Sequence, residues 1–216
     1  IINERKKSFI TLGVVIGIVI SLISFKKLIW EDQEKAEILN LIAVTYIENG
    51  NYQTAIFGDS IKKFHDLPEE LKGDSIEFTG INGILEDSKL KGTSAAKFSK
   101  YLLGICYYNL ALEEVEEETK KGYFSKALES LDNCKSKNKA QSSRAKEVIG
   151  DIFLELNQPE TALEYYQKAL KIISQRWNKN TSAKPFLLKK AAVTAKILGN
   201  NKLAKDYYQE IKDKFP

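Results

Sequence analysis

Hydrophobic residues recur at helical spacing along most of the chain, most clearly between Val148 and Leu170. The apolar positions of this stretch fall into two sets, Ile149, Ile152, Phe153 and Leu156 and then Ala162, Tyr165, Tyr166, Ala169 and Leu170. Steps of three and four residues place each set on one face of a helix. The break at Asn157-Gln158-Pro159 predicts a turn between the two helices. We therefore expect a helix-turn-helix unit.

Small and large residues alternate in this unit as two closely crossing helices require. Gly150, Ala162 and Ala169 occupy the positions of closest approach, and Phe153 and Tyr166 fill the space beside them. This arrangement resembles the tetratricopeptide repeat (TPR). One such unit cannot bury its apolar face alone, so the resemblance implies that similar units stack on it.

Three further segments carry the same pattern. They are centred on Ala43, Tyr46, Gly50, Tyr52 and Ala55, on Tyr101, Gly104, Tyr107, Ala127 and Leu131, and on Leu188, Ala192, Ala195, Ala204 and Tyr208. In the first of them the second helix departs from the pattern, because Asp59 and Lys62 occupy positions that call for an aromatic residue and an alanine. These four units predict an all-α chain with a TPR-like solenoid of about four helix-turn-helix units. One N-terminal transmembrane helix is expected before the solenoid, in the uncharged segment 9–25.

Two segments interrupt the regularity. Residues 58–94 are rich in glycine and predict an irregular region with brief helical turns. The second unit carries eleven more residues between its halves than the Val148 unit. Eleven residues are almost three whole helical turns, so we expect an extended helix 94–120. Its protruding end would carry Glu113, Glu114, Glu116, Glu117 and Glu118 either as a solvated extension or as an acidic docking knob.

Residues 9–25 contain no charged residue. As a helix they measure roughly 26 Å, slightly less than a hydrocarbon core of about 30 Å. The apolar Leu28, Ile29 and Trp30 add length. We predict a membrane span; a secretory signal peptide is disfavoured because no small-x-small cleavage site follows, and a buried soluble helix is the other alternative. The expected division is a tail and transmembrane helix over 1–30 and a soluble domain over 31–216.

The charges flanking this segment predict its orientation. Arg5, Lys6 and Lys7 precede it, and Lys26 and Lys27 follow it directly. The positive-inside rule then favours a cytoplasmic N-terminus and a domain outside the cytoplasm. Small residues recur every four positions within the segment, at Gly13, Gly17 and Ser21, and such a stripe predicts a packing face for a partner membrane helix.

Composition excludes several classes of function. A net charge of +4 is too small to indicate nucleic-acid binding. The single histidine, His65, has no accompanying ligand motif or nucleophile, and no phosphate-binding glycine loop is present. We therefore expect no enzyme, no metal, no cofactor and no small-molecule substrate. The two cysteines, Cys106 and Cys134, fall on small-residue positions and are expected to be buried thiols, with a bridge between facing helices left open.

A narrower resemblance rests on the N-terminal apolar segment and on two motifs. These are Ala55-Ile56 with Gly58-Asp59, and Gly92-Thr93-x-Ala95 followed by Tyr101-x-x-Gly104-Ile105-Cys106-Tyr107-x-Asn109-Leu110. Together they are similar to the bacterial YfgM-like family of membrane-anchored TPR proteins, ancillary subunits of the Sec translocon. The resemblance implies a single-pass inner-membrane protein with a periplasmic TPR domain. The implied partners are the SecYEG-type translocon, a membrane-anchored periplasmic chaperone of the PpiD type, and the client polypeptides that leave the channel.

The first helices of stacked TPR units line a concave face, which predicts where a partner would bind. The residues expected there are Tyr101, Ile105, Tyr108, Asn109, Asp151, Leu154, Glu155, Lys189, Val193 and Lys196. The tyrosine and leucine side chains would pack against an apolar segment of the partner, and the charged side chains would determine its register. The alternative for Tyr101 and Tyr108 is packing on the neighbouring unit. The alternative function is a structural scaffold of another envelope complex, including the cell-division machinery.

Overall fold

The computed structural model describes residues 26–59, 77–132, 138–174 and 183–215. They form a helix over residues 26–48 (helix 26–48) and then α2 (Tyr52–Phe57), α3 (Gly80–Glu86), α4 (Ser94–Glu113), α5 (Glu117–Asp132), α6 (Lys139–Glu155), α7 (Pro159–Ile173), α8 (Ala183–Ile197) and α9 (Asn201–Lys214). Within these ranges there is no β-strand, only an isolated bridge between Asp59 and Phe78. The prediction of an all-α fold is confirmed for the described residues.

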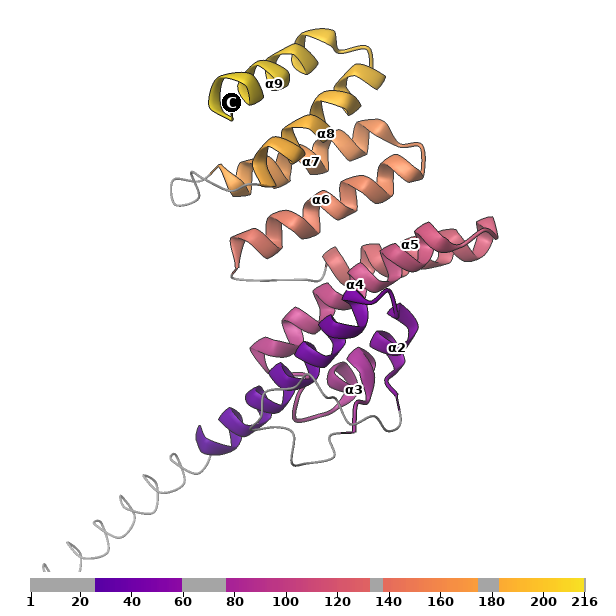
Figure 1. The fold of residues 1–216 in the computed structure, drawn as a ribbon, viewed down its shortest axis with the longest axis vertical. Helices are drawn as coiled ribbons and strands as arrows, with labels where there is room; N and C mark the ends of the chain where they lie inside the picture. The colour runs from indigo at the N-terminus through magenta and orange to yellow at the C-terminus, as the bar shows by residue number, and fades with distance from the viewer. Residues whose placement is uncertain (1–25, 60–76, 133–137, 175–182, 216) are drawn as a thin grey trace, which may run out of the picture.

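The helices pair into hairpins that stack in chain order. Figure 1 shows the stack running from helix 26–48 through the hairpins α4–α5 and α6–α7 to α8–α9 at the C-terminal end. The apolar side chains form three successive clusters. The first lies between helix 26–48, α2, α3 and α4, the second between α4, α5 and α6, and the third between α7, α8 and α9. Each hairpin thus buries its apolar face against its neighbours.

Three of the hairpin turns share one hydrogen-bonding pattern. Gly50, Asn157 and Gly199 each adopt positive φ at the end of a first helix. The amide of each donates to the carbonyl three residues back, and the amide of the following residue donates to the carbonyl five back. This pair of bonds satisfies the last carbonyls of the helix and reverses the chain. The turn predicted at Asn157 is confirmed, and Gly50 and Gly199 form turns of the same kind.

Glycines mark the closest crossing within two hairpins. A Cβ added to Gly150 would lie 2.6 Å from Cε1 of Tyr166 and 3.2 Å from the carbonyl oxygen of Ala162. A Cβ added to Gly104 would lie 2.5 Å from Cγ of Leu131. These contacts join the two helices of a unit as the sequence pattern predicts.

The second helix of the first unit, α2, has only six residues, whereas the sequence predicts only that it departs from the repeat pattern. It ends at Phe57 because Gly58 turns the chain away with φ of 85°. The amide of Asp59 then donates to the carbonyl of Phe78 at 3.0 Å. Helix α3 supplies Ile81 and Ile84 to the core in place of the missing turns.

Hydrogen bonds made by polar side chains join helix 26–48 to the start of α4. The side-chain oxygen of Gln33 accepts hydrogen bonds from the amides of Ser94 at 2.9 Å and Ala95 at 3.3 Å. The buried Asn40 donates to the carbonyl of Ala95 at 2.8 Å and accepts from the hydroxyl of Ser99 at 2.7 Å. A buried amide that is satisfied on both sides fixes the register between two helices.

The prediction of one helix over residues 94–120 is wrong. Helix α4 ends at Glu113 and α5 begins at Glu117. The extra residues are shared, since α4 continues nine residues beyond Gly104, whereas α6 continues five beyond Gly150. At its other end α5 begins ten residues before Ala127, whereas α7 begins three before Ala162. The extensions of four and seven residues are one and two whole turns, so both helices keep their buried faces.

The hairpin α4–α5 nevertheless protrudes from the stack, as Figure 1 shows. Its tip holds the glutamates of the predicted extension and Val115, whose side chain is 94% exposed. The Glu114 carboxylate accepts from the amides of Val115 and Glu116, and the Glu116 carboxylate accepts from the amide of Thr119. The acidic side chains thus form the turn themselves.

Several predicted features lie outside the described residues: the apolar segment 9–25 with Gly13, Gly17 and Ser21, and also His65 and Cys134. No helix in the described part of the chain is long and apolar enough to cross a membrane. The described Cys106 is a buried free thiol, and burial raises its pKa to about 12.

Candidate partner-binding face

The first helices of the units lie beside one another. Helices α4 and α6 are in contact, and α8 reaches α6 through Lys190, whose ammonium lies 2.7 Å from a carboxylate oxygen of Glu147 and of Asp151. We call the surface formed by helix 26–48, α4, α6 and α8 the first-helix face. All ten predicted binding residues lie on α4, α6 or α8.

On α4 this face is aromatic and half-buried. Tyr101, Ile105 and Tyr108 pack against the cluster that joins α4, α5 and α6. The Tyr108 ring lies 6.4 Å from that of Phe124, and burial followed by the charge of Asp151 raises its pKa to about 12. Asn109 donates to the carbonyl of Ile105 at 2.8 Å. The two tyrosines therefore pack on the core and keep part of their surface open.

On α6 the face is charged. Arg144 pairs with Glu147 on the same helix, and Glu147, whose side chain is only 9% exposed, pairs also with Lys190. Burial alone would raise the pKa of Glu147, but hydrogen bonds from Lys190 and Arg144 lower it. The Asp151 carboxylate accepts from the hydroxyl of the buried Tyr166 at 2.7 Å. These four charges largely neutralise one another.

The remaining predicted residues differ in exposure. Leu154 is half-buried, and Glu155 is exposed beside it. On α8 the predicted Lys189, Val193 and Lys196 are all exposed, so that helix offers the most open part of the predicted site.

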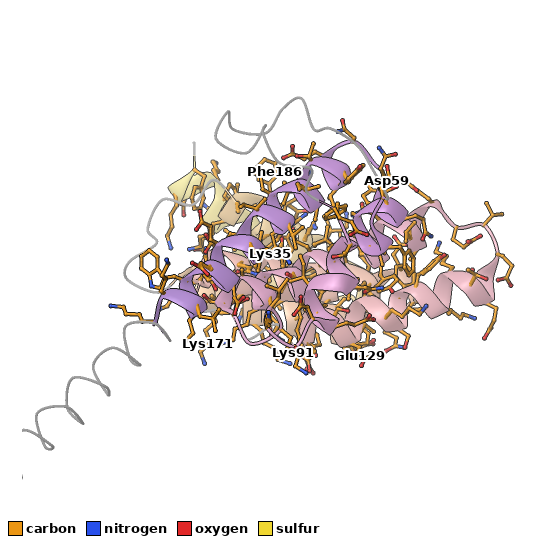
Figure 2. All side chains as sticks on the ribbon, turned by 90° about the horizontal axis from the view of Figure 1, so that it is seen from below. Lys35, Asp59, Lys91, Glu129, Lys171 and Phe186 are labelled. Carbon is orange, nitrogen blue, oxygen red and sulfur yellow. The ribbon has the colours of Figure 1, made fainter. Side chains whose placement is uncertain are left out.

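The structure places further residues on this face beyond the ten predicted ones. Phe98 and Leu112 extend the α4 stripe, Phe186 and Ile197 extend that of α8, and Arg144, Glu147 and Lys190 form the charged centre. Phe186 is labelled in Figure 2, and its side chain is 69% exposed. Helical spacing was the available signal for the apolar residues, because Phe98, Tyr101, Ile105, Tyr108 and Leu112 follow one face of α4.

The side chains of this face are suited to binding another polypeptide. Flat apolar rings beside charges are typical of surfaces that recognise polypeptides. In the described part of the chain no three acidic, histidine or cysteine side chains gather in a way that could hold a metal ion.

Comparison with known proteins identifies one repeat. The family model described as Tetratricopeptide repeat matches residues 143–176, which cover most of α6 and all of α7. No curated protein and no solved structure matches the chain. The match agrees with the Val148–Leu170 unit predicted from the sequence, so the chain contains a TPR over residues 143–176, within a fold that is helical throughout its described elements. A repeat of this class is typically a protein-interaction scaffold.

Proposed function

We propose that this protein is a non-enzymatic, membrane-anchored TPR protein that binds other polypeptides through its first-helix face. The observation that carries the binding role is the pair of open apolar stripes on α4 and α8, where Phe98, Leu112, Phe186, Val193 and Ile197 are all exposed. Exposed apolar side chains that line up along a helix face are typical of a surface that contacts a partner.

The support for membrane anchoring comes from the start of helix 26–48. Leu28, Ile29 and Trp30 are exposed there, and Trp30 has 70% of its side chain open. They follow the uncharged segment 9–25 directly, with only Lys26 and Lys27 between. Tryptophan and lysine at the end of an apolar segment are typical of a membrane interface.

The location follows from the flanking charges and the sequence resemblance. We propose a bacterial inner-membrane protein with a cytoplasmic N-terminus and a periplasmic TPR domain. It would act with the Sec translocon and a PpiD-type chaperone on chains that emerge from the channel. The support for these particular partners is the resemblance of its motifs to the YfgM-like family.

Site-specific photo-crosslinking tests this function. A photoreactive residue at Val193 or Tyr101 in the full chain in membranes is expected to capture translocon subunits or emerging polypeptides. The same residue at Tyr208, which is exposed on α9, is the matched control. Equal capture from Tyr208, or none from either test position, would contradict binding through the first-helix face.

The protruding α4–α5 tip favours a second candidate, a scaffold of another envelope complex. Val115 at this tip is almost fully exposed between glutamates, as in a docking knob. Crosslinks that appear from Val115 and not from Val193 would favour the scaffold. Removal of residues 1–25 separates the two functions further, because a client-binding surface should keep its affinity, whereas a scaffold that docks through its membrane segment should lose its complex.

A further inference from the structure

Two adjoining hollows follow the junction between helix 26–48 and the start of α4. The larger measures about 860 Å³ and the smaller about 400 Å³. Both are lined by Gln33, Glu37 and Ser94, so they form one groove, which we call the N-terminal groove. Figure 2 shows the two elements that border it, with Lys35 on helix 26–48 and Lys91 in the turn that leads into α4.

The walls of the N-terminal groove carry exposed apolar side chains. Ile29 and Trp30 line the larger hollow, and Leu41, Val44 and Phe98 line the smaller one. Trp30, Gln33, Glu37, Leu41 and Val44 are spaced by three or four residues, so they share one face of helix 26–48. Leu41 is 47% exposed and Phe98 37%. Within the described residues, therefore, apolar side chains lie open at both ends of this groove, with Gln33 and Glu37 between them.

The rim of the groove is acidic. Asp32, Glu34 and Glu37 stand along it, and Lys89 is the single cation among its described lining residues. None of the three carboxylates forms an ion pair within the described part of the chain. Charges of one sign that lack an ion pair, beside exposed apolar side chains, favour a partner of the opposite sign.

The groove is preformed. The bonds from Gln33 and Asn40 to α4 hold its two walls in one register, as described above. Two helices form most of its walls, and their backbone groups are paired within each helix, so they offer no edge to an added strand. Packing of an amphipathic helix between them is a mode of recognition that fits such a groove.

We propose that the N-terminal groove binds an amphipathic helix of a partner protein that carries lysine or arginine along one edge of its apolar face. The apolar face would lie on Trp30, Leu41 and Phe98, and the cations would meet Asp32, Glu34 and Glu37. An anionic lipid surface does not fit, because the same carboxylates repel it. This inference rests on the proposed partner-binding role and names the chemistry of one partner.

The test uses the full chain in nanodiscs of zwitterionic lipid, with the signal of empty discs subtracted. Two labelled synthetic peptides share one leucine face and differ only in carrying lysine or glutamate beside it. We expect the lysine peptide to bind about tenfold more tightly at low ionic strength. The difference should shrink in high salt, because the rim charges are exposed to solvent.

Variants locate the binding site. Glu34→Gln with Glu37→Gln should reduce the preference for the lysine peptide to about twofold or less. Leu41→Ser should weaken both peptides about equally, since it removes apolar contact rather than charge. Glu164→Gln on α7 and Tyr208→Ala on α9 are the matched controls, and neither should change binding.

Equal affinity for the two peptides overturns the inference. The same holds if Glu164→Gln reduces the preference for the lysine peptide as much as Glu34→Gln combined with Glu37→Gln does. The inference is overturned as well if the empty discs account for the whole fluorescence anisotropy signal of the labelled peptides. If a photoreactive residue at Val193 still captures polypeptides while the preference for the lysine peptide is absent, this inference fails and the proposed function stands.

Discussion

The ammonium of Lys190 on α8 lies 2.7 Å from Oδ2 of Asp151 on α6, although the two residues are 39 positions apart in the sequence. The same ammonium also meets Glu147, one turn earlier on α6. Lys190 therefore joins two consecutive first helices across the middle of the first-helix face. Both carboxylates have little exposure; Glu147 is also paired with Arg144, and Asp151 also accepts a hydrogen bond from Tyr166.

Replacement of this lysine is the first prediction. Lys190→Met should lower the free energy of unfolding by about 1–2 kcal/mol, between the values for exposed and buried ion pairs, because Lys190 is itself about one-third exposed. Urea denaturation followed by circular dichroism measures the change. Lys189→Met on the exposed side of the same helix is the control and should have little effect. Equal stability of the two variants would show that the lysine does not join the helices.

The second prediction concerns pH. Burial acts to raise the pKa of Glu147, but its bonds to Lys190 and Arg144 lower it below the ordinary value of 4.5. A carboxyl with a lowered pKa in the folded state contributes stability above its unfolded pKa and loses it as pH falls through the folded pKa. The melting temperature should thus fall below about pH 4.5.

Glu147→Gln should make that acid fall shallower, because glutamine does not titrate. Glu210, whose pKa is lowered by Lys184, will keep part of the dependence. Melting temperatures measured from pH 7 downward give the comparison, with the exposed Glu164→Gln as control. If Glu147→Gln and Glu164→Gln follow the same curve, Glu147 does not bind the two cations more tightly in its ionised form.

The third prediction compares two glycines. Gly150→Ala should destabilise the protein by about 1–3 kcal/mol through overpacking. The new methyl group would meet the ring of Tyr166, which cannot move freely because its hydroxyl is bonded to Asp151. Gly122→Ala on α5 meets nothing within 4 Å, so it should instead stabilise the helix by about 0.5–1 kcal/mol. Chemical denaturation of both variants tests the opposite signs; two changes of the same sign would contradict the crossing at Gly150.

Local patterns allowed much of this fold to be predicted. The turns at Gly50, Asn157 and Gly199 are encoded by residues that tolerate positive φ, and the crossing at Gly150 by the size of one residue. Such signals act over a few positions, so the sequence alone reveals them. The predicted binding residues lie on the first-helix face for the same reason, since helical spacing fixes which residues share a side.

Other features depend on contacts that the sequence does not display. Residues 113–121 are mostly helix formers, so periodicity could not show that Glu114 and Glu116 would bond to backbone amides and form a turn. Helical spacing places Lys190 near the surface but does not show that α6 approaches closely enough to supply two carboxylates. The position of α3 depends on a contact between two distant glycines.

That contact provides the last prediction. Gly58 and Gly80 both have positive φ, and a Cβ on Gly80 would lie 2.4 Å from the amide nitrogen of Gly58. Gly80→Ala combines an unfavourable backbone conformation with a clash against main chain, which cannot rotate aside, so it should cost about 3 kcal/mol or more. Gly50→Ala has a similar φ with nothing within 4 Å, and should cost only about 1–2 kcal/mol. Urea denaturation of the two variants separates the clash from the conformational term. Equal losses of stability would mean that the backbones of Gly58 and Gly80 are not in contact and that α3 is held by its apolar side chains alone.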